Sequence, residues 1–289
     1  MSSDDPTPSN APPRDSDVPV GGTSPRDSDV SPSEAAARTS DPARTSADPD
    51  PPTSEDRPSL PPALPAKAAL PIAVGVTVAV ALVLRYAFHP DRAGTWAMLL
   101  ALFAVYAPLA VLAIYAILKE GRAAAELRPR GGDLSFGALV GGLLFGAVMA
   151  GRQLVFGPES PQNWWIARIY LQLGDLSNNR ILWVGLAVLV IAVLEELVWR
   201  GLVMRSLRAP FGPVRAWILS SSLYAVAHVG TISLLAHPVA GPNPLVVGAA
   251  LVCGLVWGHL YNRTGRLVPS LFAHGLFSWA IVDFPLWRP

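Results

Sequence analysis

Residues Val193–Arg200 read VLEELVWR, and they end an apolar run that begins at Ile181. A run of this length can cross the hydrocarbon core of a bilayer, which takes roughly 20 residues as a helix. Ionisable side chains inside such a run cost a few kcal/mol each on insertion scales, so they indicate a functional site. The adjacent acids Glu195 and Glu196 are therefore the first candidates for that site.

Apolar runs of similar length follow one another from Ala68 to the end of the chain. They predict an all-α fold, a polytopic membrane bundle of seven to eight spans. The expected spans are Ala68–Phe88, Thr95–Leu118, Leu134–Phe156, Ile181–Trp199, Ala216–Leu235, Pro244–Tyr261 and Leu267–Phe284.

The composition divides the chain into two unlike parts. Of its 289 residues 51% are hydrophobic and 15% charged, which excludes a simple soluble enzyme. Residues 1–67 hold fifteen of the 29 prolines, with twelve Asp and Glu against six Lys and Arg. This composition predicts a disordered tail, followed by a transmembrane domain at 68–289. The net charge of +1 is the sum of two opposite segments, so it indicates no nucleic-acid partner.

The Lys and Arg residues between the expected spans predict the orientation of the chain. The loops after spans two, four and six hold ten of them, Arg200 included, whereas the loops after spans one, three and five hold three. The positive-inside rule then predicts a multi-pass protein of the cell membrane with a cytoplasmic N-terminal tail and the first span as a signal anchor. Between spans three and four, Asn163–Leu173 fits either an interfacial helix or a loop with aromatic anchors.

The spacing of VLEELVWR limits what its charged side chains can do. Glu196 and Arg200 are four residues apart, so a helix places them on one face as an ion pair. Glu195 is rotated from Glu196 by about 100° and can face another partner. A salt bridge at the end of a helix is the purely structural alternative for this group.

Two further spans carry histidines with a polar partner at the same spacing. Tyr224 precedes His228 by four residues, and His274 precedes Ser278 by four. Counted along their spans, both histidines fall at a depth similar to that of Glu195. Three helices can therefore bring one acid and two imidazoles together.

A buried carboxylate beside two imidazoles permits two kinds of chemistry. The carboxylate can take a proton from water that attacks a carbonyl, while imidazole stabilises the oxyanion. Alternatively Glu195, His228 and His274 can bind zinc, whose catalytic sites use three such ligands and one water. Both remain open from the residues alone, so the expected cofactor is none or one zinc ion.

Three ordered motifs carry a family resemblance. Glu195–Arg200 matches an EExxxR motif, Tyr224–His228 matches an aromatic-xxx-His motif, and Gly254–Ser278 resembles a C-terminal block with an R-T-G turn and L-x-P-S-x-x-x-H. In this order they resemble the CAAX-protease and bacteriocin-processing (CPBP) family of intramembrane proteases, to which Ras-converting enzyme is related. The resemblance implies that residues 181–284 are the catalytic core.

The resemblance also implies roles for single residues. Glu195 would be the general base that activates water, assisted by His228. Glu196 and Arg200 would support it structurally and electrostatically.

The oxyanion site is where this sequence departs from the family pattern. His274 would stabilise the oxyanion together with the residue four positions later. That residue is usually Asn in the family and is Ser278 in this chain. A hydroxyl donates one hydrogen bond but reaches less far than an amide.

The expected function is thus an intramembrane endopeptidase, glutamic or metallo in type. Its substrate would be a membrane-associated peptide cut near its C-terminus or in its leader. The departure at Ser278 motivates the alternative, a non-catalytic binding or immunity protein of the membrane. A transporter has less support, because the spans show no internal duplication.

Overall fold

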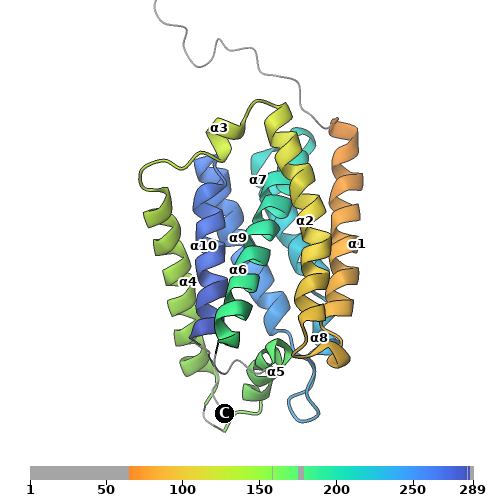
Figure 1. Cartoon of the computed structure of the whole chain (residues 1–289), viewed down its shortest axis with the longest axis vertical. Coiled ribbons are helices and arrows are strands. Elements are labelled where there is room, and N and C mark those ends of the chain that lie inside the picture. The colour runs from red at the N-terminus through yellow and green to blue at the C-terminus, as the bar shows by residue number, and fades with distance from the viewer. Residues whose placement is uncertain (1–64, 158, 175–178, 285, 287–289) are drawn as a thin grey trace, which may run out of the picture. The chain divides into compact units, whose positions relative to one another are not determined.

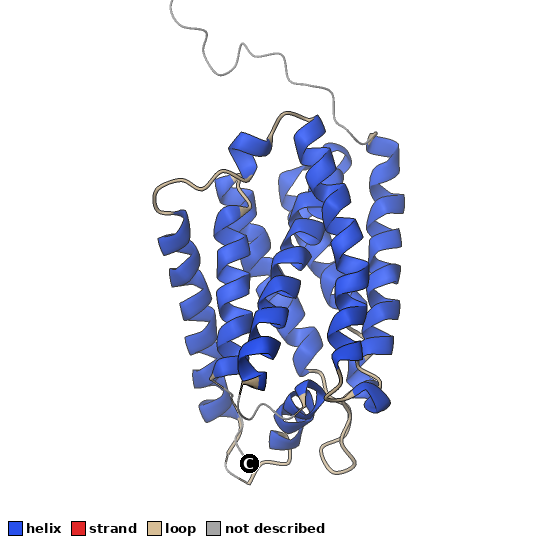
Figure 2. Cartoon of the chain, in the orientation of Figure 1, coloured by secondary structure: helices blue, strands red, loops and turns tan. Residues whose placement is uncertain are grey.

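The computed structural model describes residues 65–157, 159–174, 179–284 and 286, and this part of the chain contains helices and no strands (Figures 1 and 2). The all-α prediction is confirmed, whereas most of the predicted disordered tail lies outside the described residues. The long helices are α1 (Ala69–Ala87), α2 (Trp96–Lys119), α4 (Asp133–Val155), α6 (Arg180–Val198), α7 (Arg205–Ala227), α9 (Leu245–Thr264) and α10 (Val268–Asp283). The short ones are α3 (Ala123–Glu126), α5 (Asn163–Leu173) and α8 (Thr231–Leu234).

The helices are long and apolar enough for a multi-pass membrane protein. Five segments of the described chain meet the length and composition of a span, and one of them, Arg180–Leu234, is a run of 55 residues that contains both α6 and α7. The last predicted span corresponds to α10, which has 16 residues. Each of the seven predicted spans therefore overlaps one long helix.

Helix α6 ends at Val198, one residue before the predicted end of the fourth span, but the loop predicted after it is wrong. The helix continues beyond α6 through a π-helical turn, Trp199–Met204, directly into α7. It is interrupted at Gly212, whose backbone is non-helical at φ 76° and ψ 168°. Glu195 thus lies about 25 Å along the helix from that interruption, not at a helix end.

Arg200 is consequently not a loop residue, although its charge suggested one. Its side chain is 1% exposed, because Glu196 one turn earlier neutralises it inside the bundle. The predicted fifth span, Ala216–Leu235, is also shifted. Helix α7 ends at Ala227, so His228 caps it rather than lying mid-way along a span.

Close helix packing positions α10. Helix α10 packs against α4 and α6, while α7 packs against α1 and α9. A Cβ atom added at Gly137 or Gly141 of α4 would lie 2.7 Å from the Pro269 carbonyl oxygen or 2.8 Å from that of Ala273, respectively. These two glycines therefore let α4 approach the backbone of α10 directly.

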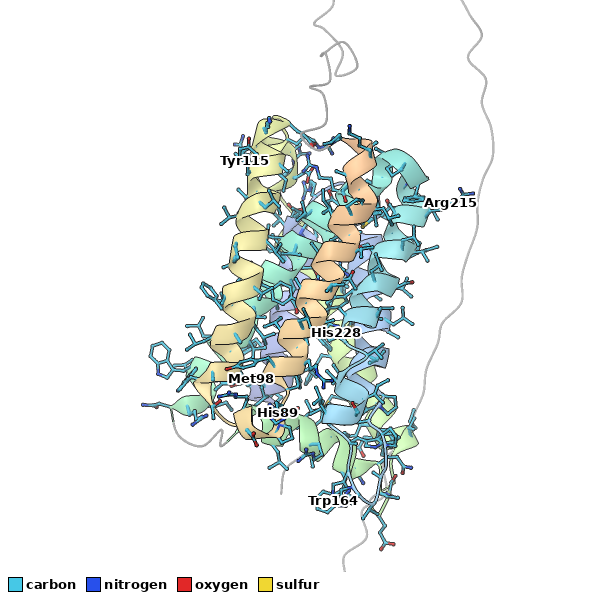
Figure 3. All side chains as sticks on the ribbon, turned by 90° about the vertical axis from the view of Figure 1, so that its right-hand side faces the viewer. His89, Met98, Tyr115, Trp164, Arg215 and His228 are labelled. Carbon is cyan, nitrogen blue, oxygen red and sulfur yellow. The ribbon has the colours of Figure 1, made fainter. Side chains whose placement is uncertain are left out.

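Helix α5 has the bounds predicted for an interfacial helix, so the loop alternative is excluded. Tyr170 donates a hydrogen bond to the Ile281 carbonyl at 2.7 Å, and Gln172 donates one to Ala87 at 2.9 Å. At the same end of the bundle, Trp164 (Figure 3) stacks on His237 with ring centroids 4.7 Å apart. Helix α5 therefore ties together the ends of α1 and α10.

At the other end of the bundle a buried acid joins α3 to the later helices. Glu126 is 1% exposed and accepts hydrogen bonds from Arg122 at 2.6 Å, Arg205 at 3.3 Å and Tyr261 at 3.2 Å. Its carbonyl accepts from the Leu267 amide that precedes α10. The hydrogen bond with Glu126 raises the pKa of Arg122. This network ties the segment after α2 to the helices that carry the candidate site.

Candidate active site

Glu196 and Arg200 form a buried ion pair within the helix that joins α6 to α7. Arg200 Nη1 lies 2.7 Å from Glu196 Oε1, and the two side chains are 1% and 0% exposed. Arg200 Nη2 donates to the Gly254 carbonyl of α9 at 2.7 Å, and Ser221 Oγ donates to the same oxygen at 2.9 Å. The pair therefore links α6 and α9, which a solvated salt bridge at a helix end would not do.

Arg200 lies in the π-helical turn Trp199–Met204, which follows α6 directly. A π-turn widens the helix by one residue, and such turns are frequent at functional sites. Trp199 at its start is 0% exposed and packs edge-on against Tyr224, with ring centroids 5.2 Å apart. The apolar stretch after the two acids is thus used for packing around them.

Glu195 faces a different set of partners from Glu196, as the 100° rotation predicts. The Tyr224 hydroxyl donates to Glu195 Oε2 at 2.8 Å. His274 Nε2 lies 3.7 Å from the same oxygen, and His228 is close enough to interact with the carboxylate electrostatically. The side chain of Glu195 is 11% exposed, against 0% for Glu196. Glu195 is therefore the acid that a substrate could reach.

The two histidines are held in different ways. His274 Nδ1 lies 3.0 Å from Glu196 Oε1, so its ring lies between the two acids. It also stacks on Trp257 of α9, with ring centroids 3.6 Å apart at 19°. His228 Nδ1 lies 2.8 Å from the Tyr224 carbonyl oxygen, and the two rings meet edge-on at 4.7 Å.

Ser278 is the predicted site residue for which the structure gives no side-chain partner among the described residues. It is half-buried in α10, one turn beyond His274, and its side chain forms no hydrogen bond with any other described residue. The other predicted residues come together from α6, α7 and α10, through the contacts given above.

Three aromatic residues at the site were not anticipated. Trp257 lies within Gly254–Ser278, the C-terminal block of the resemblance, so membership of that block is the sequence signal that could have identified it as a site residue. Trp199 lies inside VLEELVWR itself. Tyr106 belongs to α2, is 0% exposed, and interacts with Glu195 and Tyr224, yet no motif in its surroundings marks it.

The arrangement does not fit a zinc ion bound by Glu195, His228 and His274. Three ligands must converge within about 2.0–2.2 Å of one point. The Nδ1 atoms of both histidines are engaged by Glu196 and by the Tyr224 carbonyl, which leaves each Nε2 as the nitrogen that could bind a metal. No three His, Cys, Asp or Glu side chains of the described residues, however, are placed so that they could hold a metal ion together. No step of the reaction below is therefore assigned to a metal.

The comparisons with known proteins agree with the resemblance found in the sequence. Residues 177–280 match the family described as type II CAAX prenyl endopeptidase Rce1-like. No curated protein and no solved structure matches the chain. The matched segment contains every predicted site residue, and α1, α2 and α4 lie outside it. The CPBP-type recognition is confirmed for this segment, and it supports a membrane protease in general.

Proposed function

We propose that this chain, whose residues 177–280 match the Rce1-like family, is an intramembrane endopeptidase that uses a water molecule activated by Glu195. One observation carries the proposal: of two adjacent acids, only one is paired with an arginine. Arg200 forms an ion pair with Glu196, whereas Glu195 accepts a hydrogen bond from Tyr224 at 2.8 Å, lies 3.7 Å from His274 Nε2 and keeps a side chain that is 11% exposed. A carboxylate that is held in place without an arginine partner is suited to accept a proton.

In the proposed reaction Glu195 takes a proton from water as the water oxygen attacks the scissile carbonyl carbon. The C–N bond of the resulting tetrahedral intermediate breaks, and the leaving nitrogen receives the proton from Glu195. His228 assists in holding the water. The products are a new carboxyl group and a new amine, so the atoms of one water molecule are consumed.

His274 is proposed to stabilise the oxyanion of that intermediate. Its Nδ1–H donates to Glu196, which orients the ring, and its Nε2 faces the Glu195 side of the site. To donate to an oxyanion the ring must carry a proton on Nε2 as well. The adjacent acids supply the negative charge that accompanies such a doubly protonated ring.

The proposed substrate is a peptide in or at the membrane, cut near its C-terminus or in its leader. The Rce1-like match supports a CAAX-type peptide as the first substrate to assay. We place the protein in the cell membrane with the tail at 1–67 cytoplasmic and the site at 181–284 accessible from that side. The excess of Lys and Arg in the even loops supports this orientation.

The test is peptide hydrolysis by the purified protein in detergent or lipid nanodiscs. Glu195→Gln and His228→Ala should each lose a factor of about 10²–10⁴ in kcat, the usual contribution of general acid–base groups. Glu159→Gln is the control, because Glu159 is an exposed acid away from the site. Equal turnover by the wild type and the Glu195→Gln variant would contradict the proposal.

A non-catalytic membrane binding protein is the second candidate. The serine at position 278 motivates it, because the family pattern has an amide there. If the wild type cleaves nothing and Ser278→Asn creates cleavage, the chain is a binding or immunity protein. Robust turnover by the wild type would exclude that function.

A further inference from the structure

Trp257 of α9 lies against three groups around the candidate site. Its side chain is buried, and its indole ring stacks on the ring of His274, with centroids 3.6 Å apart and planes 19° from parallel. Phe277, one turn further along α10, meets the same indole edge-on at 5.9 Å. The Arg200 guanidinium carbon lies 5.7 Å from the centre of the indole ring. Trp257 therefore joins α9 to the face of α10 that carries His274.

The backbone of α9 is held on either side of Trp257 by contacts with other helices. A Cβ atom added at Gly258 would lie 2.6 Å from Trp217 Cδ1, so this glycine lets α7 and α9 approach closely. The carbonyl of Gly254, one turn before Trp257, accepts a hydrogen bond from Arg200 at 2.7 Å. The place of the indole is thus determined by contacts of α9 that do not involve α10.

The hydrogen bond to Glu196 does not by itself fix the plane of the His274 ring. Nδ1 of His274 lies 3.0 Å from Glu196 Oε1, which holds one atom of the ring. The terminal torsion of a histidine side chain is broad, so its own preference does not select one ring plane. A flat indole at 3.6 Å restricts the ring to one plane, in which Nε2 lies 3.7 Å from Glu195 Oε2.

We propose that Trp257 is a positioning residue that orients His274 for oxyanion stabilisation. The inference rests on the proposed role of His274 at the oxyanion. Glu196 holds one atom of the ring and Trp257 holds its plane, so Nε2 stays directed at the Glu195 side of the site. The electron-rich face of the indole also suits a positively charged ring, the form that can donate from both nitrogens. Trp257 acts through His274 and takes no part in proton transfer.

Three variants separate the aromatic face from apolar bulk. Trp257→Phe keeps a flat aromatic face, whereas Trp257→Leu keeps the apolar character and loses the face. Trp217→Leu is the matched control, because it also removes an indole that contacts α9. Trp217 is half-buried, donates a hydrogen bond to the Leu255 carbonyl at 2.8 Å, and lies 5.1 Å from the ring of His259 rather than from a histidine of the site.

The first test observes the imidazole ring by NMR and needs no substrate. The chain has five histidines, so in histidine-labelled protein the signal that His274→Ala removes belongs to His274. The face of an aromatic ring shields protons that lie over it, so this signal should lie upfield in the wild type, Trp257→Phe and Trp217→Leu. In Trp257→Leu it should move downfield and broaden or split, because the ring adopts more than one orientation. A His274 signal that is equally sharp and unshifted in Trp257→Leu would overturn the proposal.

The second test measures hydrolysis by the same variants. Trp257→Leu should lower kcat about 10–100-fold with KM unchanged, because misplacement of a catalytic group by 1 Å can cost about 10²-fold. Trp257→Phe should recover most of that loss. In a His274→Ala background Trp257→Leu should have no further effect on kcat, since the group that it positions is absent.

Two kinetic results would refute the positioning role. One is an equal loss of kcat from Trp257→Leu in both backgrounds, and the other is a kcat of Trp257→Leu equal to that of Trp217→Leu. Absence of any turnover by the wild type would instead refute the proposed function, and the NMR comparison would still decide whether Trp257 orients the ring.

Discussion

Replacement of Arg200 by Met should destabilise the protein strongly. Arg200 and Glu196 form an ion pair, and their side chains are 1% and 0% exposed. Among the described residues, Arg200 and the ring of His274 are the groups that contact Glu196 and can carry a positive charge. Met has a similar length and no charge, so it preserves packing but removes two hydrogen bonds at 2.7 Å, one to Glu196 and one to the Gly254 carbonyl. The Glu196 carboxylate would remain buried with only His274 to compensate it.

The size of the effect follows from that burial. Removal of one partner of a buried ion pair costs about 3–5 kcal/mol, since the other charge keeps its desolvation penalty. An exposed pair of the same residues would contribute only about 0–1 kcal/mol. For a chain of this size each kcal/mol corresponds to about 2–4 °C, so the melting midpoint should fall by about 6–20 °C.

The assay is thermal unfolding in one detergent at one scan rate. Arg215→Met is the matched control, because Arg215 is exposed and points away from the helices (Figure 3). The double variant with Glu196→Met should recover much of the lost stability, since an apolar pair carries no buried charge. A melting midpoint for Arg200→Met within about 2 °C of that of Arg215→Met would refute the reasoning, because the Glu196–Arg200 pair would then contribute no more than an exposed ion pair does.

Two further predictions concern the geometry around the site. Gly141→Ala places a Cβ atom 2.8 Å from the Ala273 carbonyl oxygen, so it should displace α10 and lower both kcat and the melting midpoint; Gly142→Ala, with no atom within 4 Å of its Cβ, should change neither. Tyr224→Phe removes the hydroxyl that donates to Glu195 at 2.8 Å but keeps the ring, so kcat should fall about tenfold without a change in KM, and an unchanged kcat would mean that this hydrogen bond has no part in the reaction.

The positions of the long helices and most of the site could be predicted from local sequence. Apolar runs predict membrane spans directly, because a helix that crosses the bilayer core must be apolar along its whole length. The i, i+4 spacing of Glu196 and Arg200 likewise reports on one face of one helix, and the structure places them in contact. The local sequence did not show that the chain stays helical after this span, because the charge of Arg200 predicts a loop there, whereas Glu196 neutralises it inside the bundle.

What the sequence by itself determined was the class of fold, the seven apolar segments, and the identity of an acid pair too costly to keep in a membrane without a purpose. Only the tertiary structure decided where His274 lies relative to the two acids: it belongs to α10, and its ring lies 3.0 Å from Glu196 Oε1 and 3.7 Å from Glu195 Oε2. The same holds for Tyr106, whose place beside Glu195 depends on how α2 packs against α6. Spacing along one helix is a local property, whereas contact between helices depends on the packing of every side chain between them.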